Sequence, residues 1–450
     1  MDHTKKTLIY AAVAIVLALL AWAFSEKRLT PELFQDQGEE FYPDFTDPNA
    51  ATTLEVIEYD NETATAQPFK VTFENGRWTI PSHHDYPADG KDRLAKTAAG
   101  LIGIKRDEFR SDNVADFEKF GVVDPLDETG PLNGRGVRVT IKAGETVLAD
   151  YIFGNPVEGR QGFRYVRIPS QSAVYASRVD VELSTNFADW IETDLLEVQK
   201  FQIRKMVLND YSINERTRSV DQRDVITLTG KNYEWKMDKV SSGKKLDSAK
   251  VQEMLTTLDE LHIVGVRPKP AGLSASLKSD LAGKQISQSD AMSLQSKGFF
   301  FSHDGNLLSN EGELQVFTND GIRYTLRFGE VVYGTGEAVS SGLENEQKNG
   351  TGSAENRYLF VTTEFDPSLL PEPKGPGNTD FQTKPDSLWT DADRDNNQRN
   401  TQHNRWEQEI QKGRERNEHL NARFADWYYV ISQESFEKLR LSRRELQVDK

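Results

Sequence analysis

The chain repeats its own pattern, and this repeat limits the fold more strongly than any other feature of the sequence. Residues 78–104 align without a gap with residues 235–261, so that Trp78 matches Trp235. Each stretch contains a strand-like run with a tryptophan, followed by a helix-like run with one apolar stripe. Repetition of the same elements in the same order indicates a duplicated unit. We expect both tryptophans to lie in the cores of their modules.

Three later motif pairs keep the same order along the chain. They are "YIFGN" at 151–155 with "LRFGE" at 326–330, "FRYVRI" at 163–168 with "NRYLFV" at 356–361, and "AVYAS" at 173–177 with "YYVIS" at 428–432. The spacing within a pair grows along the chain, which indicates inserted loops, because loop insertion costs little free energy. We therefore predict one α+β repeat at residues 51–200 and a second at 201–450.

Short turns predict that both repeats are mainly antiparallel. "FKVTFENGRWTI" alternates around Asn75-Gly76, a strong hairpin signal because both turn positions favour positive φ. The run from Gly298 to Glu330 predicts a meander of short strands, whose aromatic side chains we expect in the sheet core rather than on a sugar-stacking surface. A short helix is predicted to bury a stripe of three apolar residues, Val114, Phe117 and Phe120.

The N-terminus predicts attachment to a membrane. Residues 8–24 carry no charge, so we expect a cytoplasmic tail at 1–6, a single transmembrane helix at 7–24 and a proline-containing linker at 25–50. A cleaved signal peptide ending near Ala21-Trp22-Ala23 is the alternative. Either interpretation places the bulk of the chain outside the cytoplasm, and the first one predicts a single-pass protein of the cell (inner) membrane.

Charge and cysteine content exclude several classes of function. The chain has 55 basic and 71 acidic side chains and a net charge of -16, which repels nucleic acid phosphates. We expect no nucleic acid partner. Cysteine is absent, so disulfides and thiolate metal ligands are excluded.

Motifs for catalysis are also missing from the sequence. It contains no G-x-S-x-G elbow, phosphate-binding loop, dinucleotide fingerprint or H-E-x-x-H helix. The glycine-rich stretch at 333–355 lacks the lysine and the following helix of a phosphate cradle. We therefore predict no catalytic, cofactor-binding or metal-binding residues, and we expect a protein that is not an enzyme.

Two stretches imitate sites. Adjacent histidines on an extended segment point to opposite sides, so His83-His84-Asp85 is interpreted as a solvated strand exit rather than a metal site or general base. Residues 391–402 begin like a calcium loop, but Asn396 and Gln402 occupy the positions of the required glycine and glutamate. A solvated acidic loop is the favoured interpretation there.

The second repeat contains an insert at residues 366–425 that the first repeat lacks. Its first half has the composition of a flexible loop, and its second half predicts a helix with Trp406 and Ile410 one turn apart. Two alternatives stay open for this helix. It is either an arm that binds a partner or a helix laid on its own domain.

The order of motifs resembles a known bacterial family. "GRW", "PADGKDRL", "FEKFGVVDP", "YIFGN" and "FRYVRI", with "GLSASL" and "NRYLFV" in the second repeat, are similar to domain of unknown function 4340 over about residues 50–450. The resemblance implies a membrane-anchored extracytoplasmic protein beside an ABC-type export system, including systems related to gliding motility. It implies no catalytic residues and no cofactor, and the insert departs from the family pattern.

Two functions are therefore expected. The first is a non-enzymatic binding or scaffold subunit accessory to an ABC-type permease or another envelope protein. The alternative is a cell-envelope glycan-binding protein or hydrolase that uses carboxylates and exposed aromatic side chains.

Overall fold

The structure is a computed structural model. It describes the ranges 13–17, 36–61, 64–192, 194–214, 219–231, 234–278, 287–302, 305–334 and 355–450. Most of the predicted transmembrane helix at 7–24 lies outside these residues. Within them, no helix is long and apolar enough to cross a membrane.

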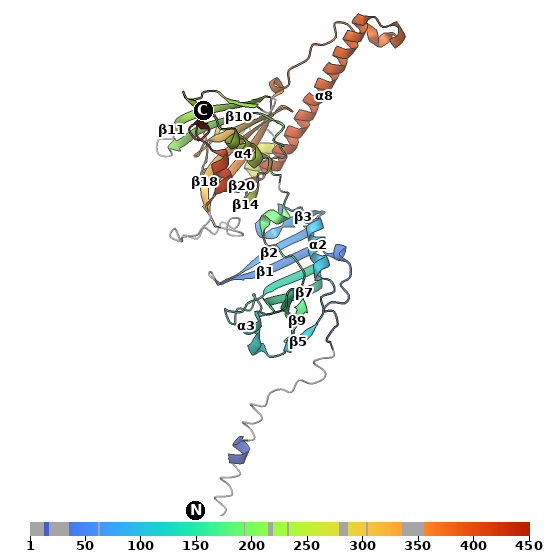
Figure 1. Ribbon diagram of the computed structural model, residues 1–450, viewed down its shortest axis with the longest axis vertical. Helices are drawn as coiled ribbons and strands as arrows, with labels where there is room; N and C mark the ends of the chain where they lie inside the picture. Colours follow the sequence, from blue (N-terminus) through green and yellow to red (C-terminus); the bar gives the residue numbers. More distant parts are fainter. Residues whose placement is uncertain are drawn as a thin grey trace, which may run out of the picture. The chain divides into compact units, whose positions relative to one another are not determined.

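A nine-stranded antiparallel sheet occupies the first part of the chain (Figure 1). Its order is β4-β3-β2-β1-β6-β7-β8-β9-β5. Its strands are β1 (Thr53–Asp60), β2 (Thr65–Glu74), β3 (Arg77–Ile80), β4 (Tyr86–Pro87), β5 (Glu108–Ser111), β6 (Val137–Ala143), β7 (Thr146–Pro156), β8 (Phe163–Arg167) and β9 (Val174–Arg178).

An eight-stranded antiparallel sheet follows, in the order β12-β11-β10-β17-β18-β19-β20-β14. Its strands are β10 (Ile203–Asn214), β11 (Ser219–Lys231), β12 (Glu234–Met237), β14 (Ile263–Pro268), β17 (Glu313–Thr318), β18 (Ile322–Tyr333), β19 (Glu355–Phe365) and β20 (Trp427–Ser432). Two small pairs accompany it, β13 (Lys244–Leu246) with β21 (Gln447–Asp449), and β15 (Phe299–Phe301) with β16 (Leu307–Ser309).

Helices pack with the two antiparallel sheets, which confirms the predicted α+β class. They are α2 (Lys91–Leu101), α3 (Phe117–Phe120), α4 (Ser248–Asp259), α5 (Ala271–Lys278), α6 (Gln288–Gln295), α8 (Asp391–Ala425) and α9 (Gln433–Leu439).

The two sheets have the same connectivity. Starting from β3 and from β12, their orders are β3-β2-β1-β6-β7-β8-β9-β5 and β12-β11-β10-β17-β18-β19-β20-β14. Each motif pair of the sequence falls on an equivalent pair of strands: β7 with β18, β8 with β19, and β9 with β20. The tandem sheet modules predicted from the repeat are therefore present.

By its contacts the chain divides into two compact units. The first contains the described residues up to Ala51, Ile57–Ala66 and Lys96–Glu182; the second contains Thr52–Val56, Gln67–Ala95 and Leu183–Lys450. This division cuts the nine-stranded sheet, so the module boundary near residue 200 stays a prediction.

The matching tryptophans occupy equivalent hairpin positions but are only half-buried. Trp78 pairs with Phe73 across the β2–β3 hairpin, and Trp235 pairs with Gly230 across the β11–β12 hairpin. The expectation that both lie fully in the core is wrong, because β12 is an edge strand and β3 has only the two-residue β4 outside it. The Trp235 ring covers Gly230, where a Cβ would lie 2.7 Å from Cζ2 of the indole.

We expect Trp78→Ala and Trp235→Ala each to lower the free energy of unfolding by about 1 to 2 kcal/mol, less than for a fully buried tryptophan. Urea unfolding of the purified protein measures this. Trp235→Phe is the matched control, because an aromatic ring still covers Gly230. Unchanged unfolding midpoints in both alanine variants would show that neither ring contributes to packing.

In each module, a glycine in a strand of the sheet leaves room for the backbone of another segment to pass directly over it. We call this close approach a crossing. In the first module Gly154 of β7 lies under the segment that leaves α3, and an added Cβ would meet the Phe120 carbonyl oxygen at 2.4 Å. In the second, Gly329 of β18 lies under the segment that leaves α6, and its Cβ would meet the Lys297 carbonyl oxygen at 2.1 Å.

An arginine binds the same glycine in each module. Arg164 donates to the Gly154 carbonyl at 3.0 Å, and Arg357 donates to the Gly329 carbonyl at 2.9 Å. Strand pairing is irregular beside both glycines, which is the signature of a β-bulge. The motifs "FG" and "RY" therefore match between the repeats because they build the same crossing.

The predicted linker at 25–50 is partly packed onto the first unit. Gly38 and Phe41 donate backbone hydrogen bonds to the carbonyls of Arg106 and Ile104. The side chains of Phe41 and Phe45 are buried. Residues 36–50 are therefore part of the folded protein. Burial of the Phe41 and Phe45 side chains removes apolar surface from water, which favours this packing over a free tether.

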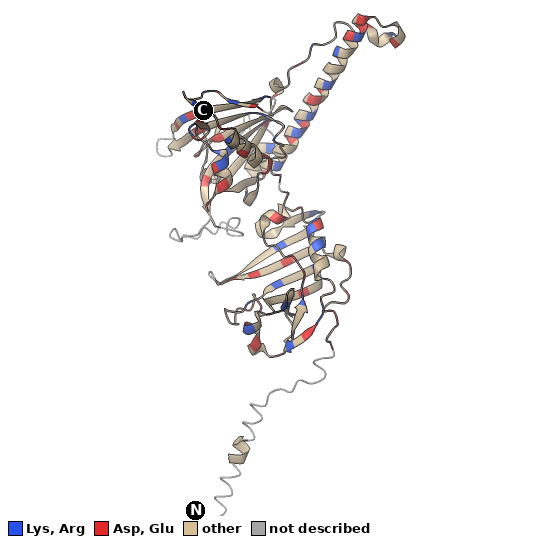
Figure 2. Ribbon diagram, viewed as in Figure 1, with Lys and Arg blue, Asp and Glu red and all other residues tan. Residues whose placement is uncertain are grey.

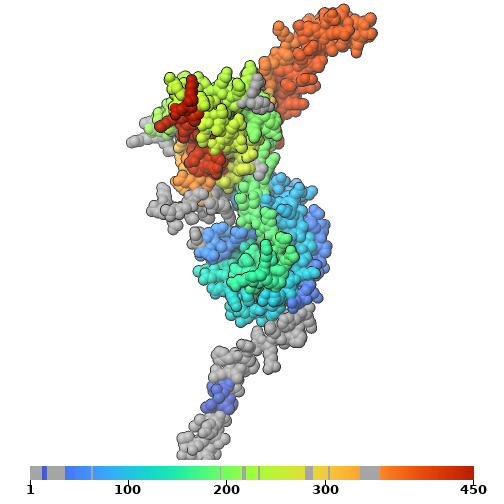
Figure 3. Space-filling model, in the orientation of Figure 1, coloured from blue at the N-terminus to red at the C-terminus, as the bar shows by residue number. Residues whose placement is uncertain are grey.

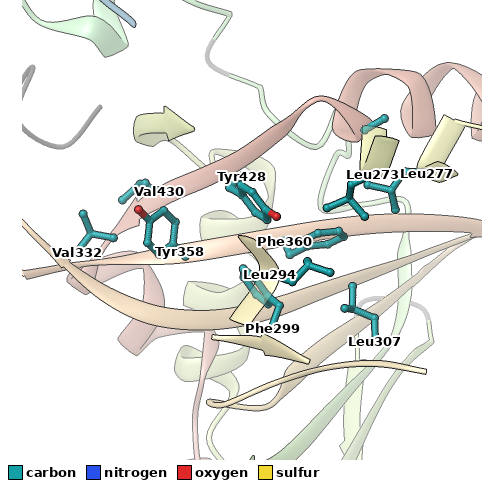
Figure 4. Packing of buried hydrophobic residues seen from close by; sticks show 11 residues of the cluster. Leu273, Leu277, Leu294, Phe299, Leu307, Val332, Tyr358, Phe360, Tyr428 and Val430 are labelled. Atoms are coloured by element: carbon teal, nitrogen blue, oxygen red, sulfur yellow. The ribbon is translucent and has the colours of Figure 1, made fainter. Parts of the chain in front are cut away.

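Aromatic rings form the core of the second module (Figure 4). Phe299 stacks parallel to Tyr428 with ring centroids 6.1 Å apart and meets the edge of Phe360 at 5.3 Å. The predicted short strands are present as β15–β18, but they form two hairpins in different sheets, so the expectation of one continuous meander is wrong. The aromatics Phe317 and Tyr324 are also buried. The expectation that these rings belong to the sheet core is confirmed.

Candidate functional site

Two hollows stand out among the described residues. The larger is a groove of about 460 Å³ in the first unit, whose lining includes Lys105, Arg160, Arg178, Asp107 and Asp180. The Arg160 guanidinium lies over the Phe163 ring and pairs with Glu108. Cations and carboxylates both line this groove, so it does not select for either sign of charge.

The smaller hollow, about 60 Å³, is lined by several carboxylates of the second module. It has room for one or two water molecules. Asp210 and Glu311 both bind the Arg440 guanidinium at 3.2 Å, and Glu313 binds Arg327 at 3.3 Å. These carboxylates form a network of ion pairs.

His83 is buried, so the expectation of a solvated strand exit is wrong for this residue. It ends a short 3₁₀ turn, Pro81–His83, and only 2% of its surface is exposed. Its ring stacks on Phe187 with centroids 4.4 Å apart. The Nδ1 atom shares a hydrogen bond with Ser82, and Nε2 has no hydrogen-bond partner among the described residues.

Burial, followed by the nearby charges of His84 and Arg267, lowers the pKa of His83 to about 4. His84 and Asp85 are exposed and adopt positive φ, which turns the chain away from the ring. Within the described part of the chain no three His, Asp or Glu side chains lie close enough to hold a metal ion. Within the triplet, His83 is therefore a buried packing residue that can titrate, whereas His84 and Asp85 are exposed.

The interpretation of residues 391–402 as a solvated acidic loop is wrong, because they form the first turns of α8. Thr390 caps the helix through a reciprocal capping box with Asp393. Asp393 also binds Lys384 at 2.9 Å, and hydrogen bonds from Thr390 and Lys384 lower its pKa to about 2. Acids near a helix N-terminus are stabilised by the helix dipole, which is a second explanation of this acidic run.

The insert forms an arm, which we define as residues 371–412. Figures 1 and 3 show α8 leading away from the eight-stranded sheet, with its N-terminal part standing clear of the module. The preceding chain runs back along the helix, since Trp406 donates to the Leu370 carbonyl at 2.9 Å and the Gly377 N–H donates to Asn396 at 2.8 Å. The arm therefore consists of the N-terminal part of α8 and the chain that precedes it, residues 371–390, which we call the strap.

The base of α8, residues 413–425, is fixed to the second module. Gly413 lies against Phe365, where a Cβ would approach the ring to 2.2 Å. Arg416 binds Asp320 at 2.6 Å, and Arg423 binds Glu197 at 2.9 Å. Leu420 and Phe424 are buried there.

A buried lysine completes the base. The Lys269 ammonium donates to the Phe424 carbonyl at 2.8 Å and lies 3.9 Å from the centre of the Phe360 ring. Burial lowers the pKa of Lys269 well below its usual value, and Asp426 opposes this shift. A cation at a helix C-terminus binds the last free carbonyls, so we assign Lys269 a role in holding α8. Sequence reasoning missed it, because no local pattern distinguishes a buried lysine.

Charges of both signs cover the exposed faces of the arm (Figure 2). Its apolar side chains Trp406 and Ile410 are half-buried, and the Trp406 indole donates to the Leu370 carbonyl. At the tip, Leu388 is 69% exposed. The arm thus offers a polar surface with one apolar side chain at its end.

Fold and site together define a protein of two tandem sheet modules, the second of which carries a projecting helical arm. Residues 78–276 match the family model described as Domain of unknown function (DUF4340), so the chain contains a DUF4340 domain. This confirms the resemblance, over a shorter stretch than 50–450. The match begins at Trp78 and ends within α5, before the arm.

No curated protein and no solved structure matches this chain.

Proposed function

We propose that this chain is a non-enzymatic scaffold subunit whose arm binds a protein partner. Residues 7–24 anchor it in the membrane, and the bulk of the chain lies outside the cytoplasm. The partner we propose is the permease of an ABC-type export system or another envelope protein. One observation carries the proposal: the fold does not need the arm. The first module joins β8 to β9 with residues 168–173, whereas the second joins the equivalent strands β19 and β20 with residues 366–426.

The structure of the arm supports binding rather than stability. Its distal part contacts its own strap, and the ion pairs and buried side chains that hold α8 to the module lie at 413–425. A helix that is polar on its outer faces gains little from self-burial. Mixed charges on such a face favour recognition by complementary charges on a partner.

Removal of the distal arm tests the proposal. Gly375 and His403 lie side by side, since a Cβ on Gly375 would be 3.9 Å from His403 Cδ2. Residues 376–402 can therefore be replaced by a short Gly-Ser turn. We expect the free energy of unfolding to change by less than about 1 kcal/mol, because the excised part packs only within itself. We also expect co-purification of the envelope partner from native membranes to be lost.

Site-specific crosslinking supplies the control. A photoreactive residue at 388, 398 or 408 is expected to capture the same membrane protein that the excision loses, whereas one at the exposed Val147 of the first module is not. Retention of every partner by the excised variant would overturn the role of the arm. The location of the chain is tested by a reporter fused after Lys450, which should be active outside the cytoplasm.

A further inference from the structure

The segment between α3 and β6, residues 122–136, is held in one conformation by a single guanidinium. The Arg135 side chain donates to five backbone carbonyls at distances of 2.6 to 3.4 Å. These carbonyls belong to Asp124, Pro125, Asp127, Gly130 and Pro131. The same guanidinium lies 4.4 Å from the centre of the Tyr59 ring.

Further bonds close the segment. The backbones of Val123, Gly134 and Gly136 are joined by two hydrogen bonds of 3.0 and 2.9 Å. The Asp127 carboxylate accepts from the backbone and hydroxyl of Thr129 and from the Gly130 N–H. Gly134, at φ +69, passes so close to the Glu118 backbone that a Cβ would lie 2.3 Å from its carbonyl oxygen. The loop is therefore ordered without any partner.

This ordered segment exposes large apolar side chains. Leu126 is 50% exposed and Leu132 is 60% exposed. Each follows a proline whose carbonyl accepts from Arg135, so both backbones are fixed by the same group. Val114, one turn before Glu118, is 67% exposed, which corrects the expectation that it belongs to a buried stripe with Phe117 and Phe120.

We propose that residues 122–136, together with Val114, form a docking surface for a protein partner that presents an apolar pocket with a basic rim. The surface is distinct from the arm and does not depend on it. A loop that is already ordered loses little conformational entropy on binding, and exposed leucines supply the apolar contact that a pocket would bury.

Charge decides between a protein and a membrane as the partner. Residues 112–136 carry the acids Asp112, Asp116, Glu118, Asp124, Asp127 and Glu128 and the cations Lys119 and Arg135. This acidic excess repels anionic lipid headgroups and complements a basic rim. We therefore commit to a protein.

Crosslinking of the full-length chain in native membranes tests the surface. A photoreactive residue at 126 and, separately, at 132 is expected to capture one and the same protein, and one at Val147 is not. Arg135→Lys keeps the charge but cannot donate to five carbonyls. We expect it to reduce the adduct from position 132 by about tenfold or more, because the loop is no longer fixed. Excision of 376–402 is expected to leave both adducts intact.

Several outcomes would overturn the proposal. In the crosslinking experiment, these are adducts with lipid, adducts between two copies of this chain, different proteins at the two positions, or no adduct. In a vesicle experiment, the contradicting result is binding of the wild type, but not of Leu126→Ser/Leu132→Ser, to phosphatidylglycerol vesicles. The circular dichroism spectrum of Arg135→Lys shows whether the module itself is still folded. If it is not, unlabelled wild-type protein and the Leu126→Ser/Leu132→Ser variant, which alters only exposed side chains, are each added as competitors. The wild type is expected to reduce the adduct and the variant to leave it unchanged, and equal competition by both overturns the proposal.

Discussion

Replacing Gly154 or Gly329 with alanine is expected to lower the free energy of unfolding by about 3 kcal/mol or more, enough to prevent folding of the affected module. At both positions the new methyl group would overlap a backbone carbonyl, 2.4 Å away at Gly154 and 2.1 Å away at Gly329. Backbone atoms of a sheet crossing cannot move as a flexible side chain would. Urea unfolding, followed by tryptophan fluorescence and circular dichroism, measures the loss.

Gly375→Ala is the matched control, since its nearest neighbour atom would be 3.9 Å from the new Cβ. We expect this change to alter stability by no more than about 0.5 kcal/mol. Equal stability of all three variants would show that the two crossings are looser than the structure has them. A loss at one crossing only would show that the modules are not equivalent there.

Acid is expected to destabilise the protein through His83, by about 3 kcal/mol between pH 6.5 and pH 4. Above pH 6.5 the imidazole is neutral in the folded and the unfolded chain. Burial lowers the pKa of His83 from 6.5 to about 4 in the folded protein, so below pH 6.5 only the unfolded chain takes up this proton. Stability therefore falls as the pH drops from 6.5 and levels off, for this group, below pH 4.

The His83→Phe variant isolates this effect. Phenylalanine keeps the stacking on Phe187 and removes the unpaired Nε2, so its stability should fall less steeply with acid by the stated amount. Carboxylates titrate in both proteins and cancel in the difference. His84→Asn, at an exposed position with positive φ that asparagine tolerates, is the control. Because burial is the larger cause of the His83 shift, this variant should keep most of the acid loss that His83→Phe removes. Parallel pH profiles for His83→Phe and wild type would contradict the assignment.

The sequence predicted the modules well, because their signals are local or repeated. Alternation and Asn75-Gly76 indicated the β2–β3 hairpin, and self-alignment found the motif pairs that fall on β7 with β18 and β8 with β19. What self-alignment did not supply was the reason for the match. The bond from Arg164 to the Gly154 carbonyl joins two strands, and periodicity within one strand carries no information about its neighbour.

The features that were missed depend on distant contacts. His83 looked polar and exposed, but Phe187, which lies far along the chain, covers its ring. The acids after Thr390 looked like a loop until a capping box and Lys384 used them to begin a helix. Arg135 resembled any surface arginine, because its five acceptors are backbone carbonyls that have no sequence signature.

The pairing of β14 with β20 sets the order in which the second module is assembled during synthesis. β14 ends at Pro268, and within the described part of the chain its one partner in the eight-stranded sheet, β20, begins at Trp427. The whole arm must therefore be synthesised before β14 can pair with β20. Pairing between strands so far apart in the sequence is slow. A nascent chain halted inside the arm would expose the edge of β19, a target for chaperones and proteases that β20 covers in the finished protein.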